Sequence, residues 1–99
     1  MIKIKVAKNY ISILGHANYD DYGKDIVCAS VSSITLCSVE AIASFDIEAV
    51  EIKQSKDKLD IIINKNDNIT NKLVNNMLNC LKELEKKYPK NIKITDKEE

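Results

Sequence analysis

The 99-residue sequence contains neither arginine nor tryptophan, and it has only one histidine and one proline. Because arginine is absent, the chain lacks the planar fork that binds phosphate groups and base edges through two parallel hydrogen bonds. Fifteen lysines are balanced by fifteen acidic residues, so the formal net charge is zero and no overall field attracts a polyanion. We therefore expect no direct contact with nucleic acid.

Cysteine is also scarce, with three residues that form no close pair in the sequence. An odd number of separated cysteines gives neither a disulfide framework nor the short pairing of a zinc site, so we expect no metal and no cofactor. No uninterrupted apolar run approaches the roughly 20 residues of a membrane span, and the N-terminus lacks the apolar block of a signal peptide. These absences predict a cytoplasmic protein without a membrane partner.

The residues that are present predict one folded domain over the whole chain. Hydrophobic residues make up 44 % of the sequence and charged residues 30 %, which is ordinary for a globular domain of this length. Several segments show the period-2 alternation or the β-branched content of strands. They are residues 2–6, 10–14, 47–52, 59–63 and 92–94.

Two longer segments have helical periodicity. The first runs from Asp25, as N-cap, to Phe45, and because its serine and β-branched content lowers helix propensity, we expect it to be buried on more than one side. The second starts at Asp67 or Asn68 and stops before Pro89. Its predicted apolar stripe is Ile69, Leu73, Met77, Cys80 or Leu81, and Leu84. The expected fold is α+β, with a mixed β-sheet of about five strands, two helices packed on one face and the order ββαββαβ.

Both glycines lie in one loop, residues 15–24, which also contains the only histidine. His16 follows Gly15 at the start of this loop, and Cys28 lies beyond the loop in the first turn of the predicted helix. Free backbone N–H groups and the positive end of the helix dipole favour a thiolate there, and they could also stabilise an oxyanion. The spacing permits a cysteine nucleophile with a histidine base. From the residues alone, a cysteine on a helix is more simply a small buried apolar residue, which is how we interpret Cys37 and Cys80.

The roles of the neighbouring residues stay open at this point. Asp25 can cap the helix or orient the imidazole of His16, and the sequence does not decide between the two. Ser32 follows Cys28 by about one turn and can share its face, although bonding to the helix backbone is the simpler role. Tyr19 and Tyr22 can anchor the loop or line a substrate cleft.

One dense run of residues resembles the signature of the ribosomal-processing cysteine protease family, called Prp. It combines a Gly-His pair with Gly-x-Asp-Ile-Val-Cys-Ala at a fixed separation, and it covers Gly15 to Ser32. The matching residues are Gly15-His16-Ala17, Tyr19, Tyr22-Gly23-Lys24-Asp25-Ile26-Val27-Cys28-Ala29 and Val31-Ser32. The family often has a second alanine where this chain has Ser30, a difference that affects no catalytic position.

The resemblance implies a homodimeric bacterial protease with Cys28 as nucleophile, His16 as general base and Asp25 at the acidic position. Its implied substrate is the precursor of large-subunit ribosomal protein twenty-seven, from which a short N-terminal extension is removed at a hydrophobic motif. An apolar groove beside Cys28 is therefore expected. We assign several residues of the 15–24 loop, together with Ser32, to a set that contacts the substrate. The members of this set are Gly15, Ala17, Tyr19, Tyr22, Gly23 and Ser32.

Two alternatives belong to other functional classes. In the first, the loop and the start of the helix grip a peptide without cleaving it, as a non-catalytic ribosome-associated binding module. In the second, Cys28 is a redox thiol, which is the weaker alternative because no resolving cysteine lies near it in the sequence.

Overall fold

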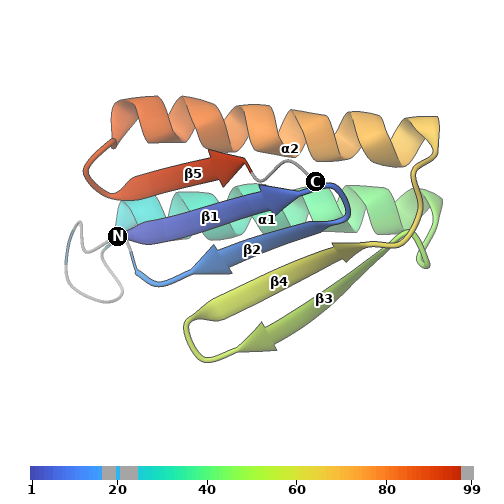
Figure 1. The fold of residues 1–99 in the computed structure, drawn as a ribbon, viewed down its shortest axis with the longest axis horizontal. Coiled ribbons are helices and arrows are strands. Elements are labelled where there is room, and N and C mark those ends of the chain that lie inside the picture. Colours follow the sequence, from blue (N-terminus) through green and yellow to red (C-terminus); the bar gives the residue numbers. More distant parts are fainter. Residues whose placement is uncertain (17–19, 21–24, 97–99) are drawn as a thin grey trace.

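The computed structural model describes residues 1–16, Asp20 and residues 25–96, and it has the predicted α+β architecture (Figure 1). Two helices and five strands follow one another in the order ββαββαβ. Their bounds are β1 Ile2–Ala7, β2 Tyr10–Leu14, α1 Ile26–Phe45, β3 Val50–Ser55, β4 Lys58–Ile63, α2 Asn68–Lys87 and β5 Ile92–Asp96. The predicted element order and fold class are confirmed.

The five strands form one mixed sheet in the order β3-β4-β2-β1-β5. β1 is parallel to β5, and the other neighbours are antiparallel. Because the side chains of a strand alternate between faces, the register aligns isoleucines on one face, where Ile4 lies opposite Ile13 and Ile11 opposite Ile61. The other face carries exposed lysines such as Lys3 and Lys5.

Both helices cover the isoleucine face of the sheet (Figure 1). The buried residues of α1 recur about once per turn and form a single stripe, and those of α2 form a second stripe. The stripes are Val27, Val31, Thr35, Val39 and Ile42 on α1, and Thr70, Val74, Met77 and Leu81 on α2. The core is thus one layer between the sheet and the helix pair.

The structure corrects three expectations about these helices. The α1 helix is buried on one side only, because a single sheet face and one neighbouring helix leave its outer side to solvent, and Phe45 is 67 % exposed. The buried stripe of α2 begins at Thr70 instead of Ile69, because the Thr70 hydroxyl donates to the capping carboxylate of Asp67 and can therefore be buried. Neither Cys37 nor Cys80 is a core residue, since both are free and exposed.

The expectation that no segment is long enough to cross a membrane also needs correction. By length and composition, α1 is apolar enough for a membrane span. The sequence count missed it because serine and threonine interrupt the apolar run. A core helix of a soluble protein passes the same test, and α1 places its stripe against the sheet and α2. The absence of a membrane partner therefore stays a prediction.

Candidate active site

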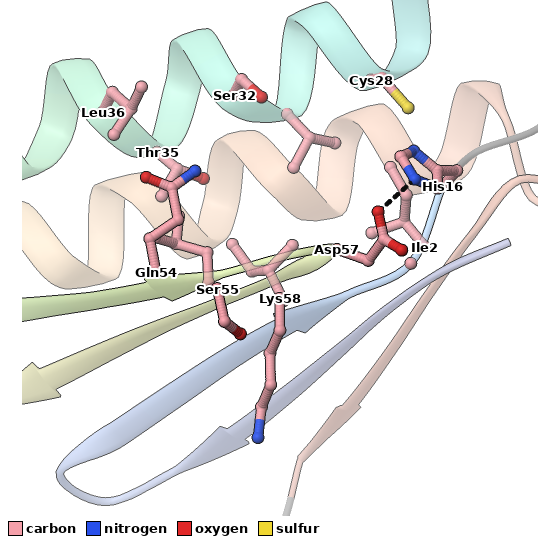
Figure 2. A pocket seen from close by; sticks show the side chains of 14 residues that line it. Ile2, His16, Cys28, Ser32, Thr35, Leu36, Gln54, Ser55, Asp57 and Lys58 are labelled. Carbon is pink, nitrogen blue, oxygen red and sulfur yellow. Dashed lines mark hydrogen bonds and ion pairs between the residues drawn. The ribbon is translucent and has the colours of Figure 1, made fainter. Parts of the chain in front are cut away.

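The ends of three elements meet at one corner of the molecule. The antiparallel pairing of β2 with β4 aligns Leu14 with Lys58, so the end of β2 lies beside the turn of the β3–β4 hairpin. Between this turn and α1 lies a cleft of about 330 Å³, which is lined by both His16 and Cys28 (Figure 2). That volume is at the lower end of the usual range for ligand sites, roughly 300–1,000 Å³. The fold therefore brings together the histidine and the cysteine that the sequence singled out.

Cys28 occupies the first turn of α1, as predicted, and is half-buried. Asp25 is the N-cap: its Oδ1 accepts the backbone N–H groups of Val27 and Cys28, each at 3.0 Å. These two N–H groups are therefore occupied in this structure, which overturns the expectation that they are free for an oxyanion. The Asp25 carboxylate also places a negative charge at the positive end of the helix dipole, and it opposes the effect of the dipole on a thiolate.

The capping role of Asp25 is thus observed. Its second oxygen, Oδ2, accepts the backbone N–H of Asp20 at 3.5 Å, so the same carboxylate reaches back into the segment before the helix. The carboxylate bonded to the His16 ring belongs to another residue, Asp57, whose Oδ1 lies 2.6 Å from Nε2. The two roles considered for Asp25 therefore fall to two different aspartates in this structure.

Asp57 was not singled out by the sequence. It lies in the two-residue turn between β3 and β4, with a positive φ of 63°, a conformation that aspartate tolerates better than most residues. Its backbone oxygen accepts the N–H of Gly15 at 2.8 Å, next to the side-chain contact with His16. In the sequence, Lys56-Asp57 has the pattern of an ordinary polar turn, and nothing in that pattern indicates a partner 41 residues away.

Gly15 is required by geometry at the end of β2. Its φ is +94°, and a Cβ atom added there would lie 2.9 Å from the backbone oxygen of Met1. Only glycine adopts this conformation without steric strain. The predicted bend at Gly15 is thus present, and it directs His16 into the cleft.

The other residues assigned to the substrate loop have different outcomes. Ser32 lines the cleft one turn after Cys28, followed by Thr35 and Leu36 (Figure 2). The predictions for the rest of the loop lie outside the described residues. These are Ala17, Tyr19, Tyr22 and Gly23.

The cleft has apolar and polar sides. Apolar side chains come from β1, β2, α1 and β4, and the hairpin contributes the polar residues Gln54, Ser55 and Lys58 to the lining. Lys58 also lies 3.6 Å from Asp60 on the open face of the sheet. Burial alone would raise the pKa of Asp60, but hydrogen bonds from Tyr10 and Ser12, together with Lys58, hold the pKa of that carboxyl below its ordinary value. The hairpin is thus anchored by polar contacts on the side away from the cleft.

Across residues 1–16, 20 and 25–96, no group of three or more His, Cys, Asp or Glu side chains is placed to hold a metal ion. Within these residues, none of the three cysteines forms a disulfide. The expectation that the protein needs neither metal nor cofactor stays a prediction.

Comparisons with known proteins show the family of the chain. Residues 1–93 match the family model described as cysteine protease Prp. The ribosomal processing cysteine protease Prp of Staphylococcus aureus is 31 % identical over 86 residues, covering 84 % of this chain and 81 % of that protein. The protein of the same name from Mycoplasma genitalium is 39 % identical over 56 residues, 57 % of this chain and 54 % of that protein.

Solved structures extend the similarity to the fold. The S. aureus Prp protease in complex with a covalently linked product peptide superimposes with a TM-score of 0.91 at 27 % identity, covering 98 % of this chain and 100 % of that chain. The same protease with a substrate peptide gives 0.85 at 26 % identity with the same coverage. The resemblance noted in the sequence is therefore confirmed, and the chain belongs to the Prp family of ribosomal-processing cysteine proteases.

Proposed function

We propose that this chain is an endopeptidase that removes the short N-terminal extension of the precursor of large-subunit ribosomal protein twenty-seven. One observation carries the proposal: in a member of a cysteine protease family, the only histidine and Cys28 line the same cleft. Figure 2 shows the His16 ring and the Cys28 sulfur at the same end of the cleft. The peptide complexes of the S. aureus protease support a peptide substrate.

The chemistry follows from these two side chains. The Cys28 thiolate attacks the scissile carbonyl carbon, a C–S bond forms, and the carbonyl electron pair moves to oxygen. When the intermediate collapses, the C–N bond breaks and the His16 imidazolium donates its proton to the leaving amine. His16 then takes a proton from water, the resulting hydroxide attacks the thioester, and the thiolate leaves with the acid product released. Donors for the oxyanion must come from groups other than the backbone N–H groups that Asp25 occupies.

The cleft is suited to an extended peptide with apolar side chains. Val31 and Leu36 from α1 and Leu59 from β4 supply apolar surface, while Ser32 and Gln54 supply polar groups at its border. This mixture matches the general character of peptide and ligand sites, which are mostly apolar with a few placed polar groups. It supports the proposed cleavage within a hydrophobic motif.

The test is cleavage of the organism's own precursor, followed by intact mass. The wild-type protein should yield two fragments, and Cys28→Ser and Cys28→Ala should yield none while keeping the wild-type circular dichroism spectrum. Cys80→Ser, at an exposed site on α2, is the matched control and should cleave normally. If the wild-type protein and its variants all bind the precursor and none of them cleaves it, the chain is instead a peptide-binding module.

We also propose a cytoplasmic homodimer. Exposed apolar side chains at the end of α1 and just after it, Phe45 and Ile47, support a second copy as the partner that covers them. Sedimentation equilibrium should then give twice the chain mass of 11.2 kDa. A single species at 11.2 kDa at micromolar concentration would refute the dimer.

A further inference from the structure

We propose that Asp57 is the positioning residue of the site, a carboxylate that holds Nε2 of His16 so that Nδ1 is presented to Cys28. The inference rests on the proposed function, since it assigns a role within the same reaction. It concerns a residue that lies outside the loop and helix carrying the family motif.

The tautomer of the His16 ring depends on the partner of each ring nitrogen. A neutral imidazole has one N–H donor and one acceptor nitrogen, and the partner of one nitrogen fixes the role of the other. A carboxylate 2.6 Å from Nε2 can only accept, so Nε2 carries the proton and Nδ1 is the acceptor. Figure 2 shows the ring between the Asp57 carboxylate and the Cys28 sulfur. The bond to Asp57 therefore selects the tautomer that can accept a proton from the thiol.

The β3–β4 hairpin holds the Asp57 carboxylate in place beside the end of β2. Asp57 contacts two consecutive residues, accepting the Gly15 N–H through its backbone oxygen at 2.8 Å and bonding the His16 ring through its side chain. The turn that holds it is closed by the Ser55–Lys58 pair, and Lys58 is paired with Leu14. The hairpin and the end of β2 are thus joined on both sides of the contact. Such support is what keeps a catalytic histidine in one orientation.

The strength of the contact between His16 and Asp57 depends on its exposure to water. The side chains of His16 and Asp57 are 51 % and 44 % exposed, and an exposed ion pair contributes little because water screens it. A peptide that fills the cleft would exclude part of this water and strengthen the pair when the imidazolium forms. We therefore expect loss of the Asp57 carboxylate to lower kcat moderately, because the pair is strengthened only while a peptide fills the cleft.

Other charged and titratable groups around His16 act differently. Cys28 faces the ring from α1, and Asp25 lies at the same helix end but caps the backbone. Figure 2 shows the Lys58 ammonium directed away from His16. The Met1 segment approaches Gly15 through its backbone oxygen. Asp57 is the carboxylate with an observed bond to the ring.

The experiment compares two substitutions that tolerate the positive φ of position 57. Asp57→Asn keeps an acceptor oxygen without the charge, and Asp57→Gly removes the side chain. Glu83→Gln, on the exposed surface of α2, is the control for loss of one negative charge. We expect kcat to fall about threefold in Asp57→Asn and about tenfold in Asp57→Gly with KM unchanged, magnitudes set by an exposed pair and a lost orienting bond.

The split between kcat and KM separates positioning from simple support of the fold. A positioning residue acts when the reaction proceeds, so kcat should fall in both variants while KM and the free energy of unfolding, measured by urea denaturation, stay near the wild-type values. A defect of the fold alone lowers the free energy of unfolding together with the activity. A kcat within twofold of wild type, a rise in KM alone, or a loss of activity that the loss of stability accounts for would overturn the proposal.

A spectroscopic measurement tests the same assignment without cleavage. The single histidine gives one set of ring ¹⁵N signals, and at about pH 9, where histidine side chains are neutral, Nε2 should be the protonated nitrogen in wild type. Asp57→Gly should shift the ring toward a mixture of tautomers. The same mixture in wild type would refute positioning by Asp57 even if cleavage depends on Cys28. Full cleavage by Cys28→Ser would instead refute the proposed function, and the inference with it.

Discussion

The carboxylate of Asp25 and the backbone N–H of Cys28 are joined by a 3.0 Å hydrogen bond at the start of α1. Asp25, at the acidic position of the family motif, thus bonds to the backbone of Cys28, at the position of the nucleophile. Because the same oxygen also accepts the Val27 N–H, the first turn of the helix is held together by one side chain. The position of Cys28 in the cleft therefore depends on a cap.

Substitution of Asp25 tests this assignment. Asn is as good a cap as Asp, so Asp25→Asn should keep the free energy of unfolding within a few tenths of a kcal/mol and keep cleavage within about threefold. Asp25→Ala removes the acceptor and should lower the free energy of unfolding by about 1 kcal/mol, measured by urea denaturation. A loss of cleavage of about 100-fold in a fully stable Asp25→Asn variant would show that its charge acts in the reaction.

Much of the site could be predicted from the sequence because its determinants are local. The cap at Asp25, the bend at Gly15 and the first-turn position of Cys28 all depend on residues within a few positions of one another. The contact between His16 and Asp57 depends on strand pairing that brings together two residues 41 positions apart in the sequence. A lysine-aspartate turn has the same sequence whether it faces solvent or a histidine. The sequence alone therefore could not assign a role to Asp57.

The helix surfaces show a similar limit. The predicted stripe of α2 was wrong by one residue at its start because hydrophobicity alone favours Ile69 over Thr70. A threonine is buried at low cost when its hydroxyl has a partner, and here Asp67 both caps the helix and accepts that hydroxyl. Hydrophobicity alone also could not decide whether Cys80 or Leu81 belongs to the stripe. Leu81 is the core residue.

Thr35 and Thr70 form a matched pair for a stability prediction. Both are buried, but within the described part of the chain Thr35 Oγ1 has no hydrogen-bond partner, whereas Thr70 Oγ1 donates to Asp67 at 3.1 Å. Thr35→Val replaces an unsatisfied hydroxyl with a methyl group and should raise the free energy of unfolding by about 1 kcal/mol, or Tm by about 4–8 °C. Thr70→Val should lower it. A decrease in both variants would show that Thr35 Oγ1 is hydrogen-bonded in solution.

Gly15→Ala should damage both the fold and the site. An L-residue at φ +94° is strained, and its Cβ would meet the Met1 backbone oxygen, so we expect a loss of about 2 kcal/mol in the free energy of unfolding. Cleavage should fall further than stability explains, because the next residue is His16. D-alanine at position 15, introduced by chemical ligation at Cys28, suits a positive φ and is the control. Equal losses with D- and L-alanine would show that backbone conformation is not the cause.

The stability of the fold should decline in acid for reasons unrelated to the site. The hydrogen bond from Lys65, helped by the Glu48 backbone N–H, holds the pKa of Asp46 below its ordinary value, and the Thr70 N–H does the same for the pKa of Asp67. A carboxyl with a lowered folded-state pKa stabilises the fold fully above the unfolded value of about 3.9, and this contribution is lost as pH falls further.

The urea midpoint should therefore be flat from about pH 7 to 5 and fall below about pH 4, where the carboxyl groups become protonated in the unfolded chain first. Lys65→Met removes the ammonium whose Nζ lies 2.6 Å from Asp46, so the pKa of Asp46 should return toward its ordinary value and the acid decline should become shallower. Because these side chains are exposed, 1 M salt should have a similar but smaller effect on wild type. A decline of equal slope in both proteins would assign the acid sensitivity to other carboxylates.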